Sequence, residues 1–539
     1  MIAKLPHKIY SVSLFFILAV SAFLNGCKQP HEYKQQADDD TYNIIDSKWQ
    51  DEFGPKANYR ISDVNASPDD IQIPMEIPDS GVLTLQHAVS LATAYNREYQ
   101  LQKELLYVTA LDVTLFRHVF EKQFFGGAFS EYNSDELSET VNTEADFGFS
   151  QLLEDGTLVT TRLATGWLSV IGGNFDGGVS SILTASITKP LLRGSSRDIV
   201  MEDLTQAQRD ALYQIRSFNR FRKQFVVSII TDYYTILQFY DALQNANENY
   251  QVLSDMYDKT QNLVKSGRIP LFELNEAEQD LYKAKDSMIS AEKDYTQALD
   301  DFKILLGIPT YWDFEPDVTE LRALVDAGID LPIYSESEVL DTAFAERLDL
   351  ANAADFIDDA KRKIIVAQDA LRAEANLFAA TSANTERTQD LRFSNNIDDE
   401  YNVALDLDLP LDRLFERNEY RKALIVLNQR QREYQLTADT VALDVRRAHR
   451  DFLEASQRYH VQLDSLNLAR KRYKNTFMLL QYGRTDTRDV LDAQEDYYDA
   501  QNEATQSLID FNIAVLNFYR DTEVLQVRPD GFWQVSKNQ

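Results

Sequence analysis

The sequence predicts an α+β membrane protein built from two internal repeats, in which long antiparallel coiled-coil helices continue into amphipathic strands. Three observations lead to this fold class. A heptad seam that follows Gly267 recurs after Gly483, at a numbering offset of 216 (483 − 267). A strand-like region precedes each copy, separated from it by a long helical segment. The chain of 539 residues holds only 18 Gly and 13 Pro, which favours long helices over many short elements.

The first seam alternates small and large side chains at steps of three and four residues. Such a stripe packs one helix closely on another, because alanine lets the partner backbone approach. Its positions are Leu274, Ala277, Leu281, Ala284, Met288, Ala291, Tyr295, Ala298, Phe302 and Leu305. The second seam occupies Val490, Ala493, Tyr497, Ala500, Ala504, Ser507, Phe511, Ala514 and Phe518. Each of these positions has its counterpart in the first seam at the same offset and without a gap, so we infer an internal duplication.

The chain carries a formal net charge of −32, one cysteine and six scattered histidines. Such an acidic chain lacks the basic surface that nucleic-acid binding requires. It suits binding or passage of cations, although a solvated surface kept soluble by charge is an equal alternative. A single cysteine excludes an intrachain disulfide, and no HExxH, CxxC or phosphate-binding glycine motif is present. We therefore expect no metal site and no cofactor.

Residues 1–26 have the pattern of an export signal, with a basic start and an apolar run from Ile9 to Leu24. The sequence Leu24-Asn25-Gly26-Cys27 resembles a bacterial lipobox. That resemblance implies cleavage before Cys27 and acylation of this residue. The alternative, a buried structural cysteine, fits poorly because Cys27 stands between a leader and polar sequence.

The remaining chain divides into an arm, two repeats and short connections. The expected segments are a signal peptide (1–26), a lipidated extended arm (27–80), a first repeat (81–310), a linker (311–334), a second repeat (335–525) and a C-terminal tail (526–539). The first repeat is expected to hold a helix after Thr84, strands at about 124–191, and helices at about 196–265 and 270–306. The second is expected to hold a helix near 338–350, strands at about 375–411, and helices at about 413–481 and 486–520.

Alternation of side chains in both strand regions indicates amphipathic strands. Val159, Leu163 and Trp167 share one face in the first half, as do Leu183 and Ile187. In the second half one face is apolar and the other acidic, with Val403, Leu405, Leu407 and Leu409 opposite Asp406 and Asp408. This pattern is typical of a transmembrane β-barrel strand. The alternative is a soluble sheet with one buried face, which this strand considered alone would favour.

The first strand region is longer than one plain hairpin needs. Residues 152–157, with the sequence LLEDGT, have the composition of an additional turn. Either the strands extend far beyond a bilayer, or an extra hairpin is present.

After the leader, no run of eighteen apolar residues occurs, so we expect no spanning helix. Export followed by amphipathic strands then predicts a barrel. One chain offers few strands and an open edge cannot lie in lipid, so several copies around an axis must close the sheet. The long helices, of about 70 residues and roughly 100 Å each, would continue the barrel as a helical tube.

Over residues 81–525 the sequence resembles the TolC-like outer-membrane efflux family. The order of four motifs carries the resemblance: Thr84-Leu85 with Ala88, Lys189-Pro190-Leu191-Leu192-Arg193-Gly194, Glu346-Arg347-Leu348-Asp349-Leu350, and Gly483 followed by Arg488-Asp489-Val490-Leu491-Asp492-Ala493-Gln494. The resemblance implies a homotrimer that shares a twelve-stranded transmembrane β-barrel, four strands from each chain, and a periplasmic α-barrel. It also implies a lipid-anchored, non-enzymatic protein of a Gram-negative outer membrane.

The function implied by the family is that of a passive exit duct. Such a duct serves a tripartite efflux or type I secretion system, and a periplasmic adaptor and an inner-membrane pump open its periplasmic end. The second hypothesis is a lipid-anchored periplasmic coiled-coil scaffold without a pore. The strands distinguish the two, because a scaffold has no need of the alternation at Val403, Leu405 and Leu407. An enzyme would need a convergent acid–base or nucleophile cluster, which the sequence does not suggest.

The resemblance also implies roles for particular residues. An acidic ring at the periplasmic entrance maps to Asp489 and Asp492, with Glu273 and Glu276 as their equivalents in the first repeat. Three copies of each would concentrate cations, and Arg484 or Arg488 would supply neighbouring bases. The alternative, stronger for Asp489 than for Asp492, is helix capping and dipole compensation.

Adaptor docking maps to the tips between the long helices. The residues are Gly267, Arg268, Ile269, Gly483, Arg484 and Thr485. Their alternative role is a simple glycine turn between antiparallel helices. Asp406 and Asp408 would line the lumen of the barrel.

Overall fold

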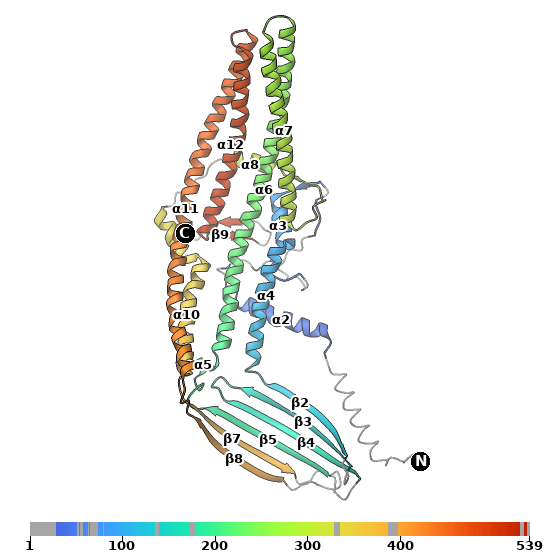
Figure 1. Ribbon diagram of the computed structural model, residues 1–539, viewed down its shortest axis with the longest axis vertical. Helices are drawn as coiled ribbons and strands as arrows, with labels where there is room; N and C mark the ends of the chain where they lie inside the picture. The colour runs from blue at the N-terminus through green and yellow to red at the C-terminus, as the bar shows by residue number, and fades with distance from the viewer. Residues whose placement is uncertain are drawn as a thin grey trace, which may run out of the picture.

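The computed structural model describes residues 28–50, 53, 56, 58–62, 64, 74–78, 80–134, 139–172, 178–327, 335–385, 397–528 and 533–535. It is an elongated molecule in which a tall layer of helices stands on a β-sheet (Figure 1). The helix tips lie at one end and the sheet at the other. Cys27 and the leader lie outside the described residues.

The first half of the chain contains three helices before the sheet, four strands and then the long helix pair. In order these elements are α2 (Pro30–Lys48), β1 (Val82–Leu83), α3 (Leu85–Tyr95), α4 (Arg97–His118), β2 (Gln123–Ser134), β3 (Glu139–Leu152), β4 (Leu158–Gly172), β5 (Gly178–Pro190), α5 (Arg197–Val200), α6 (Glu202–Lys265) and α7 (Leu271–Leu306).

The second half follows the same order with two strands in place of four. Its elements are β6 (Glu315–Pro316), α8 (Thr319–Ala327), α9 (Glu336–Glu346), α10 (Leu348–Asp369), β7 (Glu374–Thr385), β8 (Ile397–Asp408), α11 (Leu414–Gln481), α12 (Thr487–Asp521), β9 (Leu525–Val527) and β10 (Trp533–Val535). The expected long helices are therefore all present, within a few residues of their predicted bounds.

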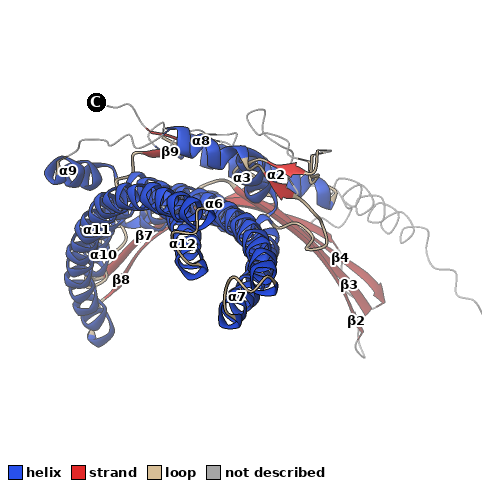
Figure 2. Cartoon of the chain, turned by 90° about the horizontal axis from the view of Figure 1, so that it is seen from above, coloured by secondary structure: helices blue, strands red, loops and turns tan. Residues whose placement is uncertain are grey.

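The long helices of the two halves end and restart at equivalent positions. Helix α6 ends at Lys265 and α11 at Gln481, while α7 begins at Leu271 and α12 at Thr487, so both pairs keep the offset of 216 (481 − 265 and 487 − 271). With 64 and 68 residues, α6 and α11 are each about 100 Å long. Seen from above, α11, α6 and α7 follow an arc with α12 on its concave side (Figure 2).

The heptad seams lie where the long helices pack together. Ala277 and Ala284 of α7 are buried, as are Ala493 and Ala500 of α12, and every other seam residue is buried or partly buried. The small side chains allow α7 to pack on α6 and α12 to pack on α11 and α6. Aromatic pairs occupy the wider parts of these interfaces, such as Tyr473 stacked on Tyr497 at 5.8 Å between ring centroids. The prediction of a coiled-coil seam is confirmed.

The main hydrophobic core lies midway along the molecule, where α3, α4 and α6 meet the end of α7. Leu91 and Ala92 of α3 are fully buried there, and the Thr84 side chain accepts a hydrogen bond from the backbone N–H of His87 at the start of the helix. Tyr233 of α6 connects this core to the short β1–β6 ladder. Its hydroxyl donates to the carbonyl of Leu83 at 2.8 Å and accepts from the backbone N–H of Asp317 at 2.9 Å.

The Glu346–Leu350 motif connects the α9–α10 junction to α11. Arg347 is buried, with its Nη2 2.6 Å from Asp349 Oδ2 and its Nη1 3.3 Å from Asp444 Oδ2 of α11. Burial by itself would raise the pKa of Asp349, but the Arg347 guanidinium, assisted by Arg220, holds that pKa below its usual range. The motif thus has a structural role in this chain, because it anchors two helices of the second half on a third.

Six strands form one antiparallel sheet in the order β2-β3-β4-β5-β7-β8. The four strands per chain that the family implies are therefore incorrect for this chain. The extra turn expected at 152–157 is present between β3 and β4, where the backbone N–H of Leu153 donates to the Thr157 carbonyl at 2.8 Å. The Lys189–Gly194 motif joins β5 to the α10–β7 junction, because the Leu191 N–H donates to the Ala375 carbonyl at 2.7 Å.

Part of the expected extended arm is a helix. Helix α2 begins at Pro30, and the Glu32 carboxylate accepts from the Gln29 N–H at 2.8 Å. The helix buries Tyr42, Ile44 and Ile45 and packs on α4. The polar composition concealed this helix, because its few apolar residues are close together at one end. Short elements also occur in the expected linker and tail, namely β6, α8, β9 and β10.

Across the described parts of the chain, no helix combines the length and apolar character needed to cross a membrane.

Replacing Arg347 by Met should destabilise the fold by about 1–3 kcal/mol, because Asp349 and Asp444 lose a buried partner. The pKa of Asp349 is depressed below 3.8 in the folded chain. Its ion pair therefore stabilises the protein above about pH 4 and is lost as the pH falls through the folded-state pKa. Arg347→Met should accordingly reduce the loss of stability between pH 5 and 3, measured by thermal unfolding of the purified protein.

Arg446→Met is the matched control, because Arg446 also joins α11 to α9, through Glu336 at 2.9 Å, with both side chains about half exposed. This exposed pair should contribute at most about 1 kcal/mol. Equal destabilisation by the two substitutions would contradict a specific role for the buried Arg347 cluster.

Candidate functional site

Both helix tips turn through a glycine in the left-handed conformation. Gly267 has φ of +69° and Gly483 of +67°. After α11, the Arg484 N–H donates to the Leu479 carbonyl and the Gly483 N–H to that of Leu480, each at 2.9 Å. The same two bonds follow α6, from Arg268 to Leu263 and from Gly267 to Val264. These bonds satisfy the last carbonyls of each helix, so the glycines have the turn role that was their alternative interpretation.

The second tip shows what caps α12. Asp486 is the N-cap residue, and its Oδ1 accepts from the backbone N–H of Asp489 at 3.0 Å. The Asp489 carboxylate accepts a hydrogen bond from the Thr485 hydroxyl and lies in the first turn, where it also compensates the helix dipole. Sequence reasoning missed Asp486, although an Asp three residues before an acidic side chain at a helix start is a capping signal.

The predicted acidic residues lie on neighbouring helices close to the tips. Glu273 and Glu276 are partly buried in the first turns of α7, whereas Asp489 and Asp492 of α12 are exposed. Arg488 lies between the two tips, with its Nη1 3.9 Å from Glu276 Oε1. Of the two bases proposed from the sequence, Arg488 is the one that the structure places beside an acid of the other tip.

A basic residue of α7 also faces the acids of α12. The pKa of Lys283 is raised, chiefly by its hydrogen bond to Asp280 at 2.9 Å, and Glu495 and Asp492 add to this effect. Carboxylates of both helices thus act on the same lysine side chain.

Large apolar side chains are exposed beside the tip turns. Leu271 and Phe272 at the start of α7 are 62% and 60% exposed, and Tyr482 at the end of α11 is 78% exposed. Exposed apolar groups gathered at the end of a long helix pair indicate a contact surface. These apolar residues are visible in the sequence, because Leu271 and Phe272 lie between Pro270 and the seam. They were missed because the segment was interpreted as a simple turn.

The sheet has one apolar face and one polar face. Cross-strand partners share a face, so the register places Phe124, Phe149, Thr161, Ala185, Thr381 and Tyr401 together across all six strands. On this face charged side chains occur only toward the strand ends, at Glu139, Lys189 and Asp399, among the described residues. Asp406 and Asp408 lie on the opposite face of β8, which also bears Glu131, Glu144, Asp146 and Arg162 of other strands. The expected alternation is confirmed.

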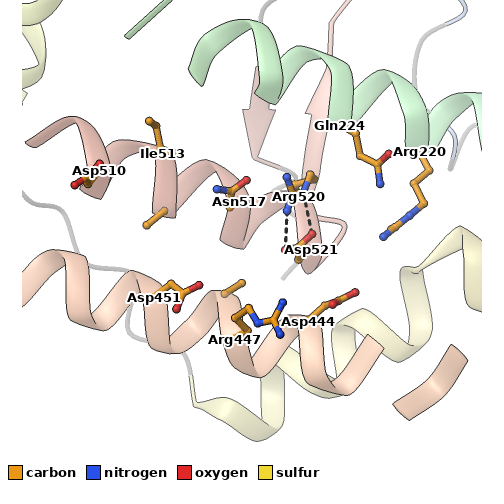
Figure 3. Close-up of a pocket in the computed structure, with 12 residues that line it drawn as sticks. Arg220, Gln224, Asp444, Arg447, Asp451, Asp510, Ile513, Asn517, Arg520 and Asp521 are labelled. Carbon is orange, nitrogen blue, oxygen red and sulfur yellow. Dashed lines mark hydrogen bonds and ion pairs between the residues drawn. The ribbon is translucent and has the colours of Figure 1, made fainter. Parts of the chain in front are cut away.

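A hollow of about 540 Å³ lies between α6, α11 and α12 near the middle of the molecule (Figure 3). Several of its charged residues belong to ion pairs, such as Arg220 with Glu523 at 3.1 Å and Arg520 with Asp521 at 2.8 Å. Acidic and basic side chains both line the hollow, so its surface does not have the single sign of charge that would attract a charged ligand. Within the described ranges, no three His, Cys, Asp or Glu side chains are placed to hold a metal ion.

The chain is similar in structure to solved outer-membrane channels. It superposes on the Campylobacter jejuni CmeC outer membrane channel with a TM-score of 0.59, at 14% identity over 90% of this chain and 92% of that one. The outer-membrane channel OprN superposes with a TM-score of 0.59, at 13% identity over 87% of this chain and 98% of that one. The open state of the Neisseria gonorrhoeae MtrE outer membrane channel superposes with a TM-score of 0.59, at 15% identity over 81% of this chain and 88% of that one. No protein-family model and no curated protein matches the chain.

At these identities the likeness concerns the fold. The chain has the helix-rich α+β fold of outer-membrane channels, and the TolC-like fold expected from the sequence motifs is confirmed. The solved structures that it resembles are channel proteins rather than enzymes.

Asp486→Ala should fray the start of α12, because the Asp489 N–H loses its acceptor; the local cost is about 1 kcal/mol. Amide hydrogen exchange should accelerate about fivefold in residues 487–490. Asp492→Ala is the control, because Asp492 lies beyond the first turn and caps no N–H. Faster exchange in the control than in Asp486→Ala would assign the cap to the wrong residue.

Proposed function

We propose that this chain is the subunit of a trimeric outer-membrane channel that acts as the passive exit duct of an efflux or type I secretion machine. The observation that carries the proposal is the continuity of an arc of long helices with a sheet that is apolar on one face and, among the described residues, unpaired at both edges. Neither element is complete in one chain. Three copies around an axis would close the arc into a tunnel and the sheet into a barrel.

The sheet supports a position in the lipid bilayer. Its strands are 12 to 15 residues long, which exceeds the 9–11 residues that a tilted strand needs to cross a bilayer. Val403 and Leu405 on the apolar face are 74% and 67% exposed in the isolated chain. Lipid would cover this face, and the opposite face, with Asp406 and Asp408, would line a water-filled lumen.

The helices support a periplasmic tunnel at the other end. They extend away from the sheet and end in the two tips, while the short elements α3, α8, α9 and β9 lie on the convex side of the arc (Figure 2). In a closed ring the convex side faces outward. The internal duplication explains why two similar helix pairs contribute to the same wall.

The tips are the proposed docking surface for a periplasmic adaptor, and the adaptor and an inner-membrane pump would open the entrance. Leu271, Phe272 and Tyr482 supply exposed apolar area beside Gly267, Arg268, Ile269, Gly483, Arg484 and Thr485. The ion pair between Arg488 and Glu276 would hold neighbouring tips together in the resting state. Acylation of Cys27 would add an anchor in the outer membrane of a Gram-negative bacterium.

Purified protein in detergent should form heat-labile trimers, and these should conduct ions in planar bilayers. Native mass spectrometry measures the first property and single-channel recording the second. The control is Cys27→Ala expressed behind an export signal that is cleaved without a cysteine, so that only the lipid is lost; this variant should still require detergent. A Cys27→Ala protein that is soluble without detergent and forms no pore would favour the coiled-coil scaffold instead.

Asp489→Ala combined with Asp492→Ala should weaken block by trivalent cations added on the side of the tips, by tenfold or more. Three copies of two lost carboxylates remove much of the negative potential of the ring. Asp439→Ala, an exposed acid of α11 far from the tips, is the matched control and should leave the block unchanged. Unchanged block in the double variant would place the constriction elsewhere.

A further inference from the structure

The extra strands occupy a defined insertion in the first half of the chain. Helices α4 and α10 both have 22 residues, and their first residues, Arg97 and Leu348, stand at a numbering offset of 251 (348 − 97). At the tips the offset between α7 and α12 is only 216 (487 − 271), so the first half is longer by 35 (251 − 216) between these points. The segment 123–157, which comprises β2, β3 and the following turn, has this same length. By length, β4 and β5 therefore correspond to β7 and β8, and β2–β3 is an added hairpin.

The added hairpin is a full part of the sheet. Strand β3 pairs with β4 at fourteen positions, from Leu152 opposite Leu158 to Glu139 opposite Gly172. The edge of β4 that would otherwise be free is thus occupied along the length of β3. Closure of the sheet through β4 would require this whole ladder to separate, which would leave its backbone groups unpaired.

The hairpin continues the two faces of the sheet. Phe124, Phe147 and Phe149 extend the apolar face, and Phe124 and Phe147 are 66% and 59% exposed. Glu144 and Asp146 of β3 extend the polar face, which on β2 also bears Phe125 and Phe129, and Asp146 lies 3.6 Å from Arg162 of β4. An appendage outside a membrane would have no reason to keep this alternation in phase with β8.

The turn between β3 and β4 is held against the start of the helical region. Gly156 has φ of +78°, and a Cβ there would lie 2.7 Å from the Gly194 carbonyl oxygen and 2.8 Å from Cγ of Pro190. Glu154 pairs with Arg197 at 2.8 Å, and the Lys189 ammonium beside Asp155 holds the pKa of that carboxyl well below its usual range. The hairpin is thereby anchored at its helix-proximal end.

We propose that β2 of one copy pairs with β8 of the next, so that three copies, with six strands each, form a wall of eighteen strands. The inference rests on the trimeric duct proposed above. Because six is an even number, β2 leaves the helices and β8 returns to them, so a β8–β2 contact between copies continues the antiparallel order around a ring. Both edge strands have 12 residues, and no other strand pairs with their outer edges among the described residues.

The partner at each edge is therefore a second copy of this chain. A head-to-tail contact of this kind closes when the rotation between copies completes a circle. Barrels of 16–18 strands enclose an aqueous channel, whereas about 8 strands leave an interior filled by side chains. The wall proposed here would surround a wide acidic lumen, so the periplasmic tips rather than the barrel would limit passage.

Disulfide cross-linking between copies tests which strands meet. Ser130→Cys on β2 is combined in turn with Tyr401→Cys, Val403→Cys, Leu405→Cys and Leu407→Cys on β8, all on the apolar face. Opposed residues in antiparallel strands have Cα atoms about 4.5–5.5 Å apart, which lies within the range that a disulfide can bridge. After oxidation of the detergent-solubilised full-length trimer, at least one register should convert most of the monomer band to covalent trimer on a denaturing gel.

The comparison set places the cysteine on β4 instead, at Thr165, with the same four positions on β8. These pairs should give no covalent trimer. Cross-links from β4 but not from β2 would establish a twelve-stranded wall and overturn the proposal. A protein that is a trimer by native mass spectrometry but forms cross-links from neither strand would also overturn it. A chain that forms no trimer at all would instead refute the proposed duct, and the eighteen-stranded wall with it.

Discussion

Close packing of α12 against α11 and α6 is the contact on which the helical half of the molecule depends. Ala493, Ala500 and Ala504 are buried along it, and the large residues Phe511 and Phe518 follow, packed on Phe452 of α11. Small side chains set the helix spacing, and the spacing sets the curvature of the arc. A larger residue at these alanines would push the helices apart, since close-packed interfaces have little free volume. The tips lie at the far end of these long helices, so packing along the seam also determines the position of the tips.

The sheet imposes the complementary constraint. An antiparallel sheet with two unpaired edges and an exposed apolar face is not a stable end state in water or in lipid. The helices cannot correct this, because they join the sheet only at its proximal end. In the trimer that we propose, other copies of the chain would satisfy both edges at once, and the direction of the edge strands permits such a ring. In that proposal the helical arc and the sheet would be completed by the same symmetry, for separate physical reasons.

Much of this architecture was predictable from the sequence, and the failures have identifiable causes. The heptads located α7 and α12 within one or two residues, because a long seam repeats its signal many times. Helix α2 was missed because Tyr42, Ile44 and Ile45 show no such repetition, and their burial depends on contact with α4. The N-cap residue Asp486 was missed, because helix capping was assigned to the nearby Asp489 as its alternative role. The sequence offered Arg484 and Arg488 as bases near the acids, but it could not decide that Arg488 pairs with Glu276, because the pair joins residues from the two different halves of the chain.

The sequence by itself determined the long helices and the alternation of the strands, because each is a local or periodic property of the chain. Gly267 and Gly483 likewise identified the turns at the ends of the long helices. Only the tertiary structure decided how many strands belong to one sheet, since the turn at 152–157 is compatible with a hairpin inside or outside it. Hydrogen-bond register between β3 and β4 resolves that choice, and register depends on contacts that composition does not encode. The same distinction applies at the tips. The glycine turns could be predicted from the sequence, whereas the neighbours of each acidic residue depend on how the two helix pairs, distant in the sequence, pack together.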